Sequence, residues 1–179
     1  MDDPPDDITP PELARLTVEL FITGGEVIAP PREPLGVMAD RAGAFVTLRT
    51  KDGLLRGCIG TLTPTRDTVA EEIIQNAISA AIRDPRFPPV AVKELSNLTY
   101  GVDVLFPPEA ARGPEDLDPS LYGVVIETLD GSRRGLLLPR IEGIDTVDQQ
   151  WRAVHQKAGI ALGTPVRVER FRVTRFGKD

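Results

Sequence analysis

The spacing of apolar residues along the chain predicts three amphipathic helices, because leucine, isoleucine, valine and alanine recur at intervals of three and four. Each of the three stretches opens with a threonine that is followed three residues later by Glu or Gln, the arrangement of a capping box. The expected helices follow Thr9, Thr68 and Thr146, and they end at Gly24-Gly25, near Asp84 and at Gly159.

Alternation of apolar and polar residues predicts strands, most of them in two hairpins. The first hairpin joins Ala44–Thr50 to the segment LLRGCIG, and the second joins Tyr122–Leu129 to GLLLP, which begins at Gly135. A strand near the carboxyl end changes its alternation at Glu169-Arg170, where we expect a bulge or break. These elements predict an α+β fold of mainly antiparallel sheets, with helices on their outer faces.

The stretch from Leu54 to Leu62 contains the single cysteine of the chain, between two glycines in an expected buried strand. A strand points successive side chains to opposite faces, and this assigns the residues to two sets. The first set is Leu55, Gly57 and Ile59, and the second set is Arg56, Cys58 and Gly60. Two interpretations follow. In the first, the glycines leave open space beside an exposed thiol. In the second, the thiol is buried and the glycines make room for a helix packed above it.

The segment DPRFPP, from Asp84 to Pro89, is a stiff turn because of its prolines. Such a loop can present Asp84, Arg86 and Phe87 at the rim of a site. Alternatively it is a rigid connector, in which Phe87 fills the core and Asp84 pairs with an arginine.

Cys58 is the candidate nucleophile, and Arg56 on the same strand face could lower the pKa of its thiol. His155 is the only histidine that could serve as a base, but a lone histidine on a helix is more often a surface or half-buried residue. The chain has no close cluster of metal-ligating residues, no P-loop, no G-x-G-x-x-G and no G-x-S-x-G, so we expect no metal and no cofactor.

With 179 residues, 41% of them apolar, the chain can bury a sizeable core. Its net charge of -6 argues against non-specific binding to nucleic acid or to an anionic membrane, although Arg167 to Lys178 is locally basic. Residues 1–7 are acidic and rich in proline, which predicts a disordered tail before a folded domain over 8–179. One cysteine allows no internal disulfide, and no exporting or membrane-spanning segment is present, so a cytoplasmic location is expected.

Several segments in order resemble the AMMECR1 family. They are AFVTLRTKDG, LRGCIG with the following TL, AAIRDPRFPP with Glu94 and Leu95, GLLLP, and KAGI from Lys157. The resemblance implies two closely joined subdomains, the larger built from both chain ends and the smaller from the middle, with LRGCIG near their junction. It also implies work alongside a Memo-type protein, related to non-haem iron dioxygenases, and a radical SAM protein. Many members have a cysteine where this chain has His155, so a shared mechanism would not depend on this histidine.

Two functions follow as expectations. One is an enzyme or small-molecule binder in which Cys58 acts as nucleophile or ligand contact and Arg56 or Arg86 holds a small anionic ligand. Its pocket would be lined by Leu55, Arg56, Gly57, Ile59, Gly60, Asp84, Arg86, Phe87, Leu138 and Pro139. The other is a non-catalytic module that docks on the Memo-like or radical SAM partner, or delivers substrate to it. We favour the second, with the same pocket as its working surface.

Overall fold

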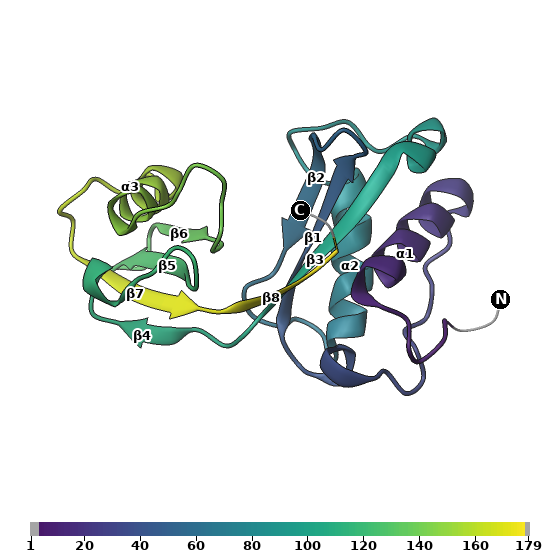
Figure 1. The fold of residues 1–179 in the computed structure, drawn as a ribbon, viewed down its shortest axis with the longest axis horizontal. Helices are drawn as coiled ribbons and strands as arrows, with labels where there is room; N and C mark the ends of the chain where they lie inside the picture. The colour runs from purple at the N-terminus through teal and green to yellow at the C-terminus, as the bar shows by residue number, and fades with distance from the viewer. Residues whose placement is uncertain (1–3, 178–179) are drawn as a thin grey trace. The chain divides into compact units, whose positions relative to one another are not determined.

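The computed structural model describes residues 4–177, which form two compact units (Figure 1). The first unit runs to Leu105 and takes in the chain again from Thr174, and the second unit is Phe106–Val173. Each unit has its own antiparallel sheet and its own hydrophobic core. The predicted α+β class is therefore confirmed.

The sheet of the first unit has the strand order β2-β1-β3-β8, so β2 lies at an edge. Its strands are β1 (Gly43–Thr50), β2 (Leu55–Gly60), β3 (Leu98–Leu105) and β8 (Val173–Phe176). The helices of this unit are α1 (Pro10–Gly24) and α2 (Val69–Ile82), with short 3-10 helices at Gly36–Ala39 and Val92–Asn97. The β1–β2 hairpin and both helices confirm the predictions from periodicity.

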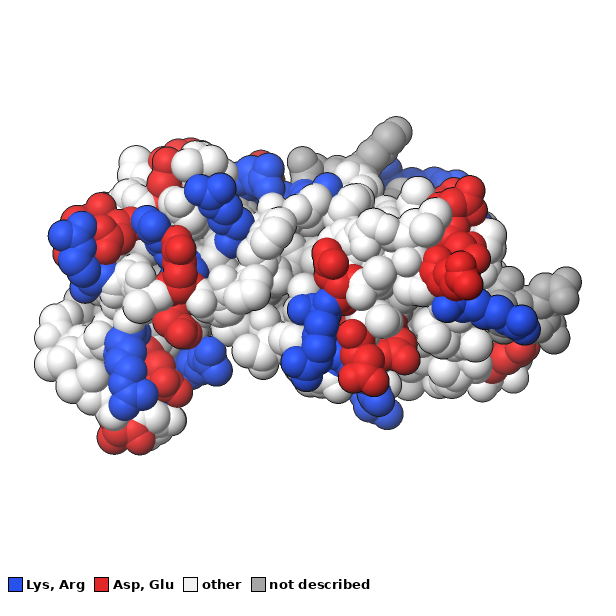
Figure 2. Space-filling view, turned by 90° about the horizontal axis from the view of Figure 1, so that it is seen from below, with Lys and Arg blue, Asp and Glu red and all other residues white. Residues whose placement is uncertain are grey.

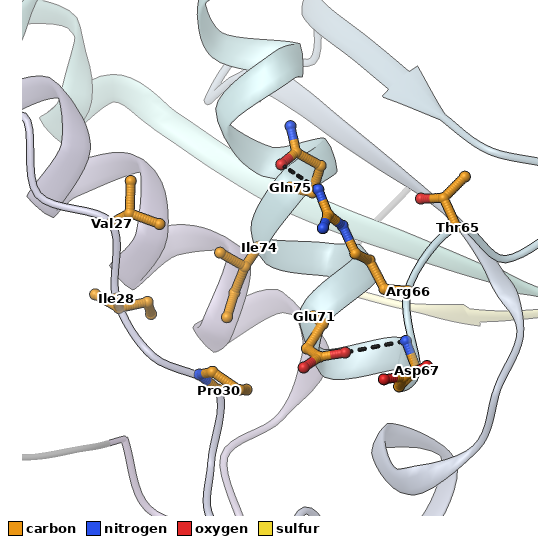
Figure 3. Close-up of a pocket in the computed structure, with 9 residues that line it drawn as sticks. All are labelled: Val27, Ile28, Pro30, Thr65, Arg66, Asp67, Glu71, Ile74 and Gln75. Carbon is orange, nitrogen blue, oxygen red and sulfur yellow. Dashed lines mark hydrogen bonds between the residues drawn. The ribbon is translucent and has the colours of Figure 1, made fainter.

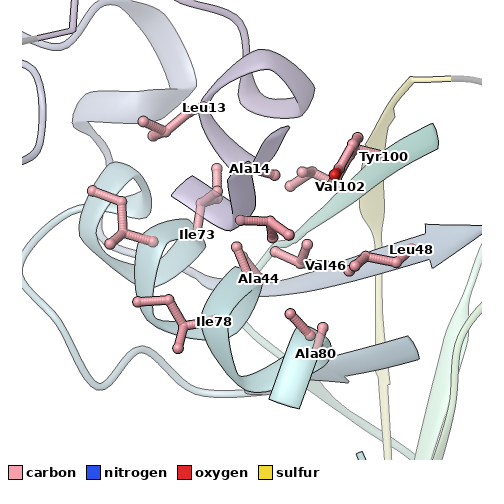
Figure 4. Close-up of a cluster of buried hydrophobic side chains, with 14 of the residues drawn as sticks. Leu13, Ala14, Ala44, Val46, Leu48, Ile73, Ile78, Ala80, Tyr100 and Val102 are labelled. Carbon is pink, nitrogen blue, oxygen red and sulfur yellow. The ribbon is translucent and has the colours of Figure 1, made fainter. Parts of the chain in front are cut away.

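One face of this sheet carries the core of the first unit (Figure 4). Val46 on β1 and Val102 on β3 lie opposite each other and are fully or almost fully buried. Leu13 of α1 and Ile73 of α2 belong to the same cluster. Burying an aliphatic side chain of this size contributes about 1.5–3 kcal/mol relative to leaving it exposed, so this face holds the two helices on the sheet.

A buried carboxylate fixes the loop between β2 and α2. Glu72 has no exposed surface, and it accepts hydrogen bonds from the Thr61 hydroxyl at 2.5 Å and from the backbone N–H groups of Thr65 at 2.8 Å and Arg66 at 2.9 Å. A buried charge is tolerated only where such donors surround it. The loop is therefore held on the first turn of α2.

The sheet of the second unit has the strand order β4-β7-β5-β6. Its elements are β4 (Glu109–Ala111), a 3-10 turn (Pro114–Asp116), β5 (Gly123–Thr128), β6 (Arg134–Leu137), α3 (Val147–Ala158) and β7 (Val166–Phe171). The β5–β6 hairpin and α3 confirm the predictions. Helix α3 lies close to β6 at Gly135. A Cβ atom at this position would be 2.5 Å from the Cβ of Ala158, so the absence of a side chain permits the approach.

The expected irregularity near the carboxyl end lies later than the sequence indicated. Strand β7 keeps its register with β5 through Glu169 and Arg170, and the strand is interrupted at Arg172, between β7 and β8. Phe171 and Val168 are both buried although they point to opposite faces, since Phe171 fills the space above Gly123. The apolar residues thus switch from one face of β7 to the other at Glu169-Arg170 because side chains are buried on both faces of the strand.

Part of the expected acidic tail contacts the fold. The carboxylate of Asp6 accepts a hydrogen bond from the backbone N–H of Glu33 at 2.8 Å, and the carbonyl of Asp6 accepts one from Leu35 at 3.3 Å. Proline limits the freedom that this segment loses on ordering, which favours such a contact. Residues 1–3 of the predicted tail lie outside the described residues.

Charges of both signs are interspersed on the surface shown in Figure 2. Two of the basic residues near the carboxyl end have acidic partners: Arg170 pairs with Glu109 at 2.7 Å, and Arg175 pairs with Asp103 at 2.8 Å. Each of these two arginines therefore has its charge balanced by a neighbouring carboxylate. Among residues 4–177, no helix combines the length and apolar composition needed to cross a bilayer.

Candidate functional site

Cys58 lies on the edge strand β2, opposite Thr47 of β1. Cys58 is half-buried, and its Sγ is 3.2 Å from the Thr47 hydroxyl oxygen. The expected alternation is interrupted at Arg56, because the register of the β1–β2 pair shifts there and leaves Arg56 without a partner on β1. Its guanidinium turns to other partners. The thiol therefore has a hydroxyl as its hydrogen-bonding neighbour.

Packing explains both glycines that flank the cysteine. A Cβ atom at Gly57 would lie 2.2 Å from the carbonyl oxygen of Ala80 in α2, and one at Gly60 would lie 2.2 Å from the ring of Phe45. Ile59, on the Gly57 face, packs against the core of the first unit. Gly57 thus lets α2 approach the sheet, and Gly60 accommodates an aromatic ring, so neither is needed to keep a floor open beside the thiol.

Asp84 binds the exposed edge of β2 at the cysteine. Its Oδ2 accepts the backbone N–H of Cys58 at 2.9 Å, and its two oxygens pair with the Arg86 guanidinium at 2.6 and 2.9 Å. Arg86 also donates to the carbonyl oxygen of Cys58 at 3.4 Å. The side chain of Asp84 is 2% exposed and that of Arg86 is 54% exposed, so the carboxylate is buried beneath its partner. Both backbone groups of Cys58 that face the sheet edge are occupied.

A second ion pair holds the other end of the DPRFPP loop. Arg56 donates to the two oxygens of Glu94 at 2.8 and 3.1 Å, and also to the carbonyl oxygen of Pro88 at 3.0 Å. Glu94 in turn accepts the backbone N–H of Ala91 at 2.8 Å. This bidentate contact fixes the loop to β2, and it uses the arginine that was expected to activate Cys58.

Phe87 lies between the two arginines. The guanidinium carbons of Arg56 and Arg86 are 5.8 and 5.6 Å from the centre of its ring, within the range of cation–π contacts. The ring is half-buried and does not belong to the core clusters. The alternative in which Phe87 fills the core is therefore wrong, whereas the expected pairing of Asp84 with an arginine is confirmed.

Burial raises the pKa of the Cys58 thiol, because the thiolate would lose hydration. The Thr47 hydroxyl and the Arg86 charge act in the opposite direction and only partly offset burial, and the charges of Asp103 and Asp84 add to the rise. Arg86 holds the pKa of Asp84 well below its usual range, helped by the Cys58 N–H. At neutral pH we therefore expect a protonated thiol beside a charged ion pair.

His155 was expected to be at the surface or half-buried, but it is buried, with 2% of it exposed. It lies on α3 in the second unit, where its Nδ1 contacts the carbonyl oxygen of Trp151 at 2.9 Å and its ring packs on the Trp151 ring. The apolar face of α3 continues through this position, so the histidine serves as a packed core residue. Leu138 and Pro139 also belong to the second unit, and their place in a common pocket stays a prediction.

Thr47 was not among the predicted site residues, and Glu94 was not predicted to pair with Arg56. The hairpin register could have found Thr47, since it lies opposite Cys58. Glu94 is separated from Arg56 by 38 residues, and only the tertiary fold brings them together. Among the described residues, no group of three or more His, Cys, Asp or Glu side chains is arranged to hold a metal ion.

These features define an α+β protein of two antiparallel sheets, with a lone cysteine on a clamped edge strand. A family model described as AMMECR1 matches residues 11–178, and the chain belongs to the AMMECR1 family.

A protein from Thermotoga maritima is 50% identical over 161 residues, covering 89% of this chain and 91% of that protein. One from Clostridium acetobutylicum is 45% identical over 92% of this chain, which spans only 35% of that protein's length. The crystal structure of an uncharacterised protein from Pyrococcus horikoshii has a TM-score of 0.85 at 32% identity, covering 95% of this chain and 90% of that chain.

We predict that Gly57→Ala lowers the free energy of unfolding by about 2 kcal/mol, because the added methyl group would push α2 away from β2. Urea denaturation followed by circular dichroism measures the change. Gly24→Ala is the matched control, since a Cβ atom there meets nothing within 4 Å. Equal stability of the two variants would show that Gly57 is not required by helix packing.

Proposed function

We propose that this chain is a non-catalytic docking module whose working surface is the DPRFPP loop and the β2 edge beneath it. The observation that supports this is that the charged side chains around Cys58 are already held in ion pairs. Arg56 is paired with Glu94, Arg86 is paired with Asp84, and burial raises the pKa of the thiol. A nucleophilic cysteine instead needs a lowered thiol pKa, supplied by a cation close to the sulfur.

The same ion pairs bear on the expected small anionic ligand. A phosphate or carboxylate would have to displace Glu94 or Asp84 to gain a bidentate contact with Arg56 or Arg86. Displacing Asp84 would leave a carboxylate that is 2% exposed without its cation, which is strongly unfavourable. Protein docking needs no such exchange, and the anionic ligand stays a prediction.

The loop offers a preorganised apolar surface. Pro85, Pro88 and Pro89 are exposed, and Val92 directly after the loop is 58% exposed. The two ion pairs hold the backbone between them, so little conformational entropy would be lost when a partner binds. We define these four residues and Arg86 as the loop surface.

The partners that we propose are a Memo-like protein and a radical SAM protein, as the family resemblance implies. In the Clostridium relative the region similar to this chain is 35% of the polypeptide, so most of that protein is additional chain. A domain that is joined to further polypeptide in the Clostridium relative is consistent with a domain that, in this protein, binds a separate partner. Delivery of a substrate to such a partner is the corresponding role.

The alternative function is an enzyme that uses Cys58 as its nucleophile. Its support is that Cys58 is only half-buried and that the Arg86 charge favours the thiolate. Alkylation kinetics separate the two functions.

We predict that iodoacetamide alkylates Cys58 more slowly than free cysteine at pH 7, because a raised thiol pKa leaves less thiolate. The rate should rise with pH and reach half its maximum above the pH at which free cysteine does. A labelling assay by mass spectrometry, from neutral to alkaline pH, provides both values. Alkylation faster than free cysteine at neutral pH would favour the enzyme.

We also predict that the purified chain binds a Memo-like or radical SAM protein from the same organism, and that Val92→Asp weakens the complex at least about tenfold. A charge there would be desolvated at the interface. Leu129→Asp is the matched control, because Leu129 is 57% exposed and lies in the second unit. Isothermal titration calorimetry measures both affinities. Absence of binding to either protein, or equal loss in both variants, would count against docking through the loop surface.

A further inference from the structure

The turns of the two hairpins contain the same dipeptide, Asp52-Gly53 between β1 and β2 and Asp130-Gly131 between β5 and β6. In each turn the glycine has a positive φ, 90° in the first and 71° in the second. The N–H of each glycine donates at 2.8 Å to the carbonyl oxygen of a threonine three residues earlier, Thr50 or Thr128. The backbone around the two aspartates is therefore alike.

The carboxylate of Asp130 is held in place. One of its oxygens accepts the backbone N–H of Ser132 at 3.0 Å and the Ser132 hydroxyl at 2.8 Å. Hydrogen bonding by Thr128 and by Ser132 lowers the pKa of Asp130 to about 2. Asp118 is held in the same way by Ser120, at 2.9 and 2.6 Å, so a serine two residues after the aspartate fixes the carboxylate in both places.

The carboxylate of Asp52 is not held. Asp52 is exposed, and in the part of the chain that the structure describes no hydrogen bond or ion pair reaches its side chain. Leu54, two residues later, has no side-chain donor, and its N–H donates to the Thr50 hydroxyl at 3.2 Å. In the second turn the corresponding threonine hydroxyl accepts the N–H of Arg133 at 3.0 Å, which leaves the Ser132 N–H for Asp130.

A carboxylate elsewhere in the first unit shows the engaged state. Glu71 accepts the backbone N–H of Asp67 at 3.0 Å, in the loop that leads into α2 (Figure 3). Asp52 lacks such a partner and is followed by glycine, which has no side chain to shield its nitrogen. A mobile carboxyl group beside an unshielded amide is the arrangement in which an aspartate can react with its own backbone.

We propose that Asp52 is a site of spontaneous isoaspartate formation, at which the Gly53 nitrogen attacks the side-chain carboxyl carbon. A C–N bond forms, and the carboxylic acid loses its hydroxyl group together with the amide proton as water, which leaves a five-membered succinimide ring. Water then adds to the main-chain carbonyl carbon of the ring and breaks its bond to nitrogen. The net reaction is an isomerisation, and it needs no oxidant or reductant.

The product changes the turn that precedes β2. Its backbone is one methylene longer between Asp52 and Gly53, within a turn in which Thr50 N–H donates to the Leu54 carbonyl at 2.9 Å. The product also exposes a new main-chain carboxylate, the group that isoaspartyl methyltransferases esterify with S-adenosylmethionine. The site lies outside the loop surface, and it does not depend on the proposed function.

The test follows the full chain during several weeks at neutral pH and body temperature. Peptide mapping by mass spectrometry with electron-transfer fragmentation distinguishes aspartate from isoaspartate at each position. We expect isoaspartate to form at Asp52 about tenfold faster than at Asp130, because Asp130 must first lose charge-assisted hydrogen bonds. Blocked peptides with the sequences Lys-Asp-Gly-Leu-Leu and Leu-Asp-Gly-Ser-Arg give the rates without the fold, and their ratio should be smaller.

Reciprocal variants test the cause. Leu54→Ser supplies the missing hydroxyl and should slow the reaction at Asp52 severalfold, and Ser132→Leu should accelerate the reaction at Asp130. Both positions are exposed, and circular dichroism checks that the variants fold. Asp52→Glu is the control, since a six-membered ring forms far more slowly, and it should remove the product at position 52 alone. The proposal is overturned by equal rates at the two aspartates, by a ratio no larger than that of the peptides, or by an unchanged rate at Asp130 in Ser132→Leu.

Discussion

The carboxylate of Asp84 is the contact on which the arrangement around the cysteine depends. It accepts the backbone N–H of Cys58 at the edge of the sheet and holds Arg86, which in turn reaches the Cys58 carbonyl. An edge strand otherwise leaves such groups free to pair with another chain. A two-residue ion pair here takes the place of a neighbouring strand, and the loop that follows α2 is thereby fixed against β2.

The remaining contacts of the loop follow from this one. With Asp84 and Arg86 in place, Phe87 lies between two guanidinium groups, and Arg56 reaches Pro88 and Glu94. Removing Arg86 would leave the buried Asp84 carboxylate, and removing Glu94 the largely buried Arg56 guanidinium, without its counter-charge, so the two pairs resist rearrangement. A site built in this way is rigid and locally neutral. Those properties suit a surface that another protein recognises better than a centre that must change protonation state.

Local patterns predicted the regular elements because the determinants are local. Threonine caps with Glu or Gln three residues later, and glycine or proline at the ends, define the three helices. Strand alternation placed Arg56 and Cys58 on one face, but the register shift at Arg56 is an irregularity that alternation cannot foresee. The cation that acts on the thiol could not be chosen in this way, because only the fold shows that Arg56 pairs with Glu94 while Arg86 turns back to Cys58.

Burial of polar residues was the main feature beyond the reach of periodicity. Glu71 and Glu72 are adjacent in the first turn of α2, and nothing in the sequence says that Glu72 is the buried one. The hydrogen-bond donors to Glu72 come from the loop at Thr61–Arg66. This loop has no periodic pattern, and its donors meet Glu72 only in the folded chain. His155 was likewise expected at the surface or half-buried and is buried, because histidine is compatible with either environment.

Hydrogen exchange at the Cys58 amide tests the central claim most directly. In the wild-type protein this N–H should exchange slowly although it lies on an edge strand, because Asp84 accepts it. Asp84→Ala should accelerate its exchange by about tenfold or more, the factor that corresponds to losing one charge-assisted hydrogen bond. Amides in the centre of β1 should be affected less. Fast exchange in the wild-type protein, or an unchanged rate in the variant, would contradict the clamp.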